Sequence, residues 1–146
     1  MRNLLVAFSL IGLTSSAMSA TQRDAQRMKV TSDNVRSSIE RIEGECQNVE
    51  NETDVYIVET LLPAINERLE DASFYFDEAA FELDKDPKSF TGRRQFQRGC
   101  SKTSQATLRV GTARIKSLDG KILTPYAEEF DELKDELEFA RETAGC

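Results

Sequence analysis

The 146-residue chain contains no histidine. This absence removes the commonest general base, the usual activator of a serine or cysteine nucleophile, and the commonest metal ligand. It also argues against two kinds of helical bundle, because haem bundles commonly ligate iron through histidine and di-iron bundles use Glu-x-x-His. We therefore expect no metal, no haem and no other cofactor.

Sequence motifs of catalysis are absent as well. The chain has no P-loop, no GxSxG and no GxGxxG. It carries 26 acidic residues, but nothing in their spacing singles out a catalytic carboxylate pair. The sequence therefore predicts a protein that is not an enzyme.

Long apolar runs are missing beyond residue 13. Arg2 precedes an apolar run over residues 4–13, and small residues fill positions 14–20. This three-part pattern predicts a secretory signal peptide over residues 1–20, and the run is too short to span a bilayer. A buried N-terminal helix is the alternative. We expect one domain over residues 21–146, secreted to the periplasm or the extracellular space, with no membrane span.

The charge balance is acidic. The formal net charge is −7, and removal of Arg2 with the signal peptide takes it to −8 (−7 − 1). Net acidity disfavours a general nucleic-acid-binding function, although it leaves room for a local basic patch.

The strongest helical pattern in the chain runs from residue 55 to residue 83. Its apolar residues recur at an unbroken three-four spacing, which predicts a long amphipathic helix over residues 54–84. Pro63 lies inside this helix, and because the stripe keeps its phase across it, a kink is favoured over a restart. The stripe consists of Val55, Val58, Leu62, Ile65, Leu69, Ala72, Phe76, Ala79 and Leu83.

Three further helices are predicted over residues 22–50, 87–118 and 124–146. Asp86 is the predicted cap of the third helix, followed by Pro87, and Thr124 is the predicted cap of the fourth, followed by Pro125. Residues 51–54 are predicted to form a capped turn before the second helix. Four helices joined by short turns predict an all-α, antiparallel up-down-up-down four-helix bundle. The predicted inward face of the third helix is Phe96, Cys100, Ser104, Leu108, Gly111, Ile115 and Leu118.

Asp119-Gly120 allows a rival interpretation. This dipeptide between two apolar segments is a hairpin signal, so a short β-hairpin around residues 113–124 is the alternative. Otherwise Gly120 ends the third helix in the left-handed conformation.

Only three cysteines are present, enough for one disulfide and one remaining thiol. With the third and fourth helices antiparallel, Cys146 comes within about one turn of Cys100, whereas Cys46 lies about 20 Å further along the axis. This geometry predicts a Cys100–Cys146 disulfide and a buried free thiol at Cys46. A Cys46–Cys100 bridge is preferred if the second helix breaks at Pro63, and Cys146 could instead join two chains in a homodimer.

Charge is segregated between the last two helices. Residues 88–116 hold eight basic and no acidic residues, and residues 124–146 hold eight acidic residues against two basic ones. One interpretation is mutual attraction between these helices, worth only about 0.2–1 kcal/mol per exposed pair. The other is a binding site in which arginines and aromatics hold anionic groups or stack. The candidate binding residues are Phe90, Arg93, Arg94, Phe96 and Arg98.

Aromatic residues also cluster around the turn between the second and third helices, where six of the ten aromatics of residues 21–146 lie. They form core, an apolar ligand cavity or an exposed contact patch. Asn51-Glu52-Thr53 is an N-glycosylation triplet, which has meaning only in a eukaryotic secretory pathway.

The sequence therefore predicts a secreted, non-enzymatic helical bundle that binds another macromolecule, with a protein as the expected partner. An inhibitor, an effector-like protein and a periplasmic adaptor all fit this description. The alternative is a carrier of a small apolar ligand in the bundle core.

Overall fold

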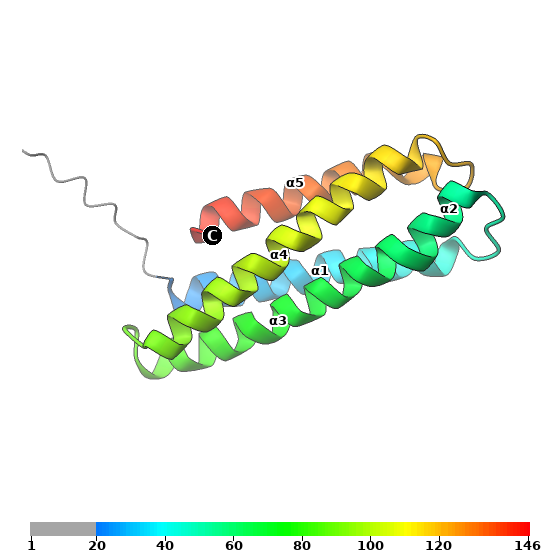
Figure 1. Ribbon diagram of the computed structural model, residues 1–146. Coiled ribbons are helices and arrows are strands. Elements are labelled where there is room, and N and C mark those ends of the chain that lie inside the picture. The colour runs from blue at the N-terminus through cyan, green and yellow to red at the C-terminus, as the bar shows by residue number, and fades with distance from the viewer. Residues whose placement is uncertain (1–19) are drawn as a thin grey trace, which may run out of the picture.

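The computed structural model describes residues 20–146, which fold as an all-α four-helix bundle (Figure 1). The predicted signal peptide over residues 1–20 lies outside the described residues, apart from Ala20. The helical elements are α1 (Gln22–Glu45), α2 (Glu52–Tyr56), the π-helical turn η1 (Ile57–Leu61), α3 (Leu62–Lys85), α4 (Phe90–Ser117), the 3-10 turn η2 (Thr124–Tyr126) and α5 (Ala127–Ala144). Since α2, η1 and α3 follow one another without a gap, they form the second long helix.

The alternative hairpin around residues 113–124 is wrong. Residues 20–146 contain no β-strand, and α4 continues through most of the proposed first strand to Ser117. Within the same residues, no helix combines the length and hydrophobicity that a membrane-spanning helix needs.

Each long helix packs against two others, so the bundle closes in the order α1, α3, α4, α5 and back to α1 (Figure 1). The end of α1 meets the start of α5, where Arg41 pairs with Glu129. At the opposite end, Ala25 of α1 and Ala144 of α5 are buried in one cluster. These two helices therefore run antiparallel, and their seam is the least extensive of the four.

Pro63 lies in the first turn of α3 and leaves the second helix continuous, as the phase of the stripe predicts. A proline lacks an N–H, and its ring clashes with the carbonyl four residues earlier, here that of Glu59. The wider turn of η1, over the five residues Ile57–Leu61, lies directly before this point. The helix therefore accommodates Pro63 by forming a π-helical turn before it.

The inward face of α4 agrees only in part with the prediction, because Phe96 is buried as predicted but the three aliphatic residues further along are not. Leu108, predicted to be core, is 71% exposed, and Ile115 and Leu118 are exposed as well. The close approach of α4 to α3 explains the change, because a Cβ at Gly99 would come within 2.6 Å of the Phe76 ring. Only small side chains fit along most of this seam, so the aliphatic residues turn outward. The buried residues of α4 are Gly92, Phe96, Gly99, Thr103, Ala106, Thr107, Val110, Ala113 and Ser117.

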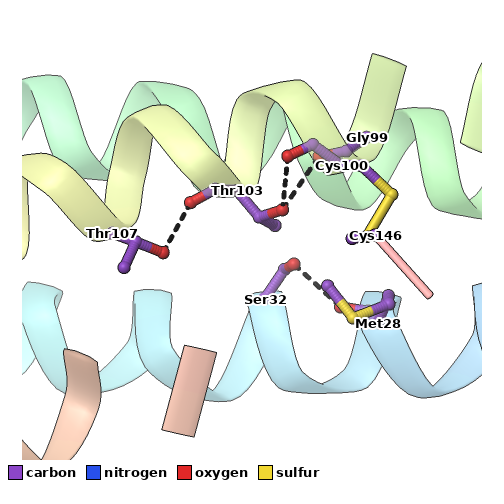
Figure 2. Close-up of a disulfide and its surroundings, with 7 residues drawn as sticks. All are labelled: Met28, Ser32, Gly99, Cys100, Thr103, Thr107 and Cys146. Atoms are coloured by element: carbon purple, nitrogen blue, oxygen red, sulfur yellow. Dashed lines mark hydrogen bonds between the residues drawn. A yellow bond between two sulfur atoms is a disulfide. The ribbon is translucent and has the colours of Figure 1, made fainter. Parts of the chain in front are cut away.

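Polar residues are buried inside the bundle, and two of them, Ser32 and Thr103, lie between its two apolar clusters along α1 and α4. Ser32, Thr103 and Thr107 are buried, yet each hydroxyl donates to a carbonyl of its own helix (Figure 2). The Ser32 bond to the Met28 carbonyl is 2.8 Å long, and the Thr107 bond to the Thr103 carbonyl has the same length. Because a buried hydroxyl is costly only without a partner, these side chains fill the interior with little penalty.

Two predicted helix starts are displaced. α4 begins at Phe90 with Ser89 as its cap, whose hydroxyl accepts from the Gly92 N–H, so the prediction of Asp86 and Pro87 at this position is wrong. Thr124 does not cap the last helix, because its hydroxyl donates to the Gly120 carbonyl. α5 starts after a 3-10 turn instead.

Two helix ends also differ from prediction. α1 ends at Glu45 rather than at residue 50, and Asn48 then adopts the left-handed conformation with φ 64°. Asparagine is one of the few residues other than glycine that enter this region readily. Gly120 is not left-handed, contrary to the prediction; among the described residues only Asn48 and Gly145 have positive φ.

Candidate binding surfaces

The candidate binding residues divide into surface and core. Phe90 is 78% exposed, and Arg93, Arg94 and Arg98 are exposed as well. Phe96 is only 4% exposed, and its ring packs edge-on against Phe76 at 5.5 Å between centroids. Phe96 is therefore a core residue, and its assignment to the binding surface is wrong. On a helix of 3.6 residues per turn, it points away from the face that carries Phe90 and Arg94.

The structure adds two aromatic residues of α3 to this surface. Arg98 lies over the ring of Tyr75, with its guanidinium carbon 5.7 Å from the ring centroid. Phe74 is exposed and meets the same tyrosine edge-on at 5.6 Å. A cation over an aromatic face is favourable, and it fixes the direction of a long side chain. Together these residues form the arginine–aromatic patch, consisting of Phe74, Tyr75, Phe90, Arg93, Arg94 and Arg98.

The sequence already marks Phe74 and Tyr75 as members of the aromatic cluster, but it cannot show which of them face solvent. The second long helix carries a second apolar stripe, consisting of Ile57, Leu61, Ala64, Phe74 and Phe81. Its early members Ile57 and Leu61 are buried. Phe81, further along, is exposed and lies under the Lys85 ammonium at 3.6 Å. The stripe therefore changes from core to surface along the helix.

The arginines of the patch make no ion pair within residues 20–146. Arg98 donates a hydrogen bond of 3.2 Å to the Gln95 side chain, an uncharged partner. In contrast, Lys102 on the next turn pairs with Asp71 of α3 at 2.7 Å. Lys102 is thus neutralised by an acidic residue of α3, whereas the arginines at the start of α4 are not.

The predicted attraction between the basic and the acidic helix is carried by a single described ion pair. Arg114 of α4 meets Asp131 of α5 at 3.0 Å. Lys134 pairs with Glu138 on its own helix. Exposed pairs of this kind contribute little stability, so the attraction between the two helices adds little to the stability of the bundle.

A second exposed feature of α4 is an aliphatic stripe near its C-terminal end, the α4 stripe. Leu108 and Ile115 are exposed and lie seven residues apart on one face of α4. Leu118 at the end of the helix and Ile122 in the following loop are exposed as well. A groove of about 270 Å³ runs beside Leu108 and Ile115 and is closed on the other side by α5. Exposed apolar side chains arranged in a row mark contact surfaces more often than scattered ones do.

The predicted disulfide is present. Cys100 and Cys146 are joined, with their Cα atoms 5.4 Å apart (Figure 2). The bond ties the C-terminus of α5 to α4, and neither the Cys46–Cys100 alternative nor an interchain bond through Cys146 occurs in this structure.

Cys46 is a buried free thiol, as predicted. Burial raises the pKa of the Cys46 thiol, since the thiolate would lose its hydration. Nearby, the Tyr126 hydroxyl donates a hydrogen bond of 2.8 Å to Glu45, and this bond raises the pKa of the Tyr126 phenol. A protonated, enclosed thiol is a poor nucleophile, which makes Cys46 a packing residue.

Asn51 has a structural role that the sequence predicts. Its side-chain oxygen accepts hydrogen bonds from the Thr53 N–H at 3.0 Å and the Asp54 N–H at 3.3 Å, so it caps α2. No group of three or more histidine, cysteine or acidic residues among residues 20–146 is placed to hold a metal ion.

Comparison with protein-family models, with curated proteins and with solved structures gives no match for this chain. The function proposed below therefore rests on the geometry and chemistry of its surfaces.

Proposed function

We propose that this chain is a secreted, non-enzymatic protein that binds a partner protein with an acidic surface through the outward face of α4. The observation that carries the proposal is the arginine–aromatic patch, in which Arg93, Arg94 and Arg98 are exposed and form no ion pair within residues 20–146. Arg98 also lies over the Tyr75 ring. Arginine and aromatic residues are the types most enriched at the centres of protein interfaces.

The basic charge of α4 indicates that the partner has an acidic surface. Residues 21–146 carry a net charge of −8, yet the segment 88–116 has eight basic residues and no acidic one. Like charges concentrated on one face repel one another, and an acidic partner relieves that repulsion while it increases the rate of encounter. A second copy docked by the same face would bring two basic surfaces together, which disfavours a symmetric dimer there.

The apolar residues of the patch supply the contact area. Phe90, Arg94 and Arg98 are spaced by four residues and therefore line one side of α4, and Phe74 adds a ring from α3. The α4 stripe continues along the same helix. A helix of 28 residues is about 42 Å long, so this face is long enough for an extended interface.

The proposal is tested by site-specific crosslinking in the native extracellular fluid. A photoreactive residue at Gln97, which is exposed between Arg94 and Arg98, is compared with the same group at Glu40 on α1. We expect a distinct crosslinked protein from position 97 and none from position 40. Equal products from both positions, or none from position 97, would contradict the proposal.

The arginines are then tested with the captured partner. Charge reversal at all three positions (R93E, R94E and R98E) should weaken binding at least about 100-fold and flatten its salt dependence, because each reversal replaces an attraction by a repulsion. The matched control is the reversal E67K with E70K on α3, whose side chains are similarly exposed. Unchanged affinity in the triple variant would assign the partner to another surface.

A further inference from the structure

A groove of about 500 Å³ runs along the seam between α1 and α5. Since α3 and α4 form the opposite side of the bundle, this groove is remote from the arginine–aromatic patch. Its volume lies within the range of small-molecule sites, about 300–1,000 Å³. Val30 of α1 is 57% exposed and Phe139 of α5 is 72% exposed, and these two side chains form its walls with Ala140 beside them.

The charges at this groove are distributed along its length. Arg23 and Arg27 line one end and are exposed, and neither forms an ion pair within the described part of the chain. They are one helical turn apart, a spacing at which like charges destabilise a helix. Glu136, the acidic residue of the lining, is seven residues from Thr143, which corresponds to about 10 Å along α5. Because α1 and α5 are antiparallel, Thr143 lies near the arginine end and Glu136 near the other.

We propose that this groove binds a single-chain aliphatic carboxylate. The alkyl chain lies along Val30, Phe139 and Ala140, where it removes apolar surface from water. The carboxylate lies between Arg23 and Arg27, whose guanidinium groups match a carboxylate in charge and in planar shape. One anion at this position also relieves the repulsion between the two arginines.

The size of the groove favours this ligand over a partner helix. The lining on α1 extends from Arg23 to Thr31, which corresponds to about 12 Å of helix. A docked helix inserts a series of apolar anchors at i, i+3, i+4 and i+7, whereas this groove has one apolar wall on each side, formed by Val30 and Phe139. The carrier function that the sequence offered as the alternative places its ligand in the bundle core, whereas the site proposed here lies at a surface seam.

The test is calorimetric titration of the full chain with decanoate and with decanol, both below the concentrations at which they aggregate. We expect decanoate to bind, and decanol to bind about tenfold or more weakly, because the alcohol lacks the charge-assisted hydrogen bonds. The double variant R23Q with R27Q should lose this preference and bind both molecules as weakly as the wild type binds decanol. Phe139→Asp should bind neither molecule.

Two control variants, altered outside the groove, show whether the loss of decanoate binding depends on the groove residues. R93Q with R94Q removes two exposed arginines on the opposite side of the bundle, and Leu108→Asp places an acid at another exposed apolar position. Both should bind decanoate as the wild type does. All substituted positions are exposed, and thermal melting followed by circular dichroism identifies any variant that fails to fold.

Three results would overturn the proposal. The first is a wild type that binds no decanoate or binds decanol equally well, and the second is undiminished binding in Phe139→Asp. The third is a concentration-dependent dimer, seen in sedimentation, that dissociates in Phe139→Asp while decanoate has no effect; this would assign the groove to a second copy. The arginine–aromatic patch is not altered in these groove variants, so their outcome is independent of the partner proposed above.

Discussion

The carboxylate of Asp54 occupies the space that a Cβ at residue 120 would need. Asp54 is fully buried at the start of the second helix, and it accepts hydrogen bonds from the backbone N–H groups of Lys121, Ile122 and Leu123, the shortest of them 2.9 Å from Ile122. The Asp54 side chain therefore holds the loop between α4 and α5. Residue 120 must be glycine because a side chain there would overlap the Asp54 carboxylate, and not because its backbone is left-handed.

Asp54→Asn should lower the free energy of unfolding by about 1–3 kcal/mol, because the amide group turns a donor toward N–H groups that need acceptors. Gly120→Ala should destabilise by a similar amount, about 1–3 kcal/mol, since its methyl group overlaps the carboxylate. Urea unfolding followed by circular dichroism measures both changes.

The glycine control for this experiment is Gly44, around which a Cβ would meet no atom within 4 Å. Gly44→Ala should leave stability unchanged or raise it by up to about 1 kcal/mol, as expected for alanine within a helix. A loss in Gly44→Ala equal to that in Gly120→Ala would show that the loop contact is not the cause.

Gly99→Ala should destabilise the bundle by about 1–3 kcal/mol, because the new methyl group would lie 2.6–2.8 Å from the Phe76 ring. Substitution Phe76→Leu removes the ring atoms in question, so the double variant should lose less stability than the sum of the two single variants. Gly111→Ala serves as the comparison, since its methyl group would make only ordinary contacts of 3.5 Å with Lys134. Additive losses in the double-mutant cycle would refute the close approach of α4 to α3.

Reduction of the Cys100–Cys146 disulfide should lower the stability of the wild type. The bond spans 46 positions of the chain, for which loop-closure entropy gives about 4 kcal/mol. Urea unfolding with and without a phosphine reductant measures the difference. The double variant C100A with C146A should be insensitive to the reductant, whereas Cys46→Ala should keep the full response. An unchanged midpoint in the reduced wild type would mean that the bond constrains little of the unfolded chain.

The Glu45–Tyr126 hydrogen bond should make stability depend on pH. This bond, followed by the Arg41 contact, lowers the pKa of the Glu45 carboxyl from its ordinary value of 4.5. A group whose folded-state pKa is lowered stabilises the fold above its unfolded-state pKa, and this contribution is lost as pH falls through the folded-state value. The stability difference between the wild type and Tyr126→Phe should therefore be present at pH 7 and shrink below pH 4.5.

The Glu45–Tyr126 hydrogen bond also makes stability depend on pH in the alkaline range, where stability falls as pH rises. Since it raises the pKa of the Tyr126 phenol, its contribution is complete at neutral pH and is lost as pH rises through the folded-state value. Absorbance titration near 295 nm should show Tyr126 ionising above its ordinary pKa of 10.0. Glu45→Gln should bring Tyr126 back toward that value; an unchanged titration in Glu45→Gln would show that the carboxylate has no influence on it.

Local patterns in the sequence were sufficient for the number of long helices and their approximate positions, although not for every helix start and end. The three-four spacing of residues 55–83 depends only on which side chains neighbour one another on a helix, so it predicts the second helix and its continuity across Pro63 without knowledge of the partners. The disulfide also follows from the sequence, because helical rise converts residue numbers into distances once two helices are taken as antiparallel neighbours.

Tertiary contacts decided which faces point inward. Both Leu108 and Val110 are aliphatic, and the close fit of Gly99 against Phe76 favours the face that carries Val110. Gly92 makes a similar close fit against Leu83. The burial of Phe96 and the exposure of Phe74 follow from the same packing, so the sequence identified the arginines of the patch but misassigned one of its aromatic rings. The anchor at Asp54 and the juxtaposition of Arg23 with Phe139 bring together residues that are remote in the chain. Sequence periodicity describes neighbours on one helix, and these relationships exist only after the helices have packed against each other.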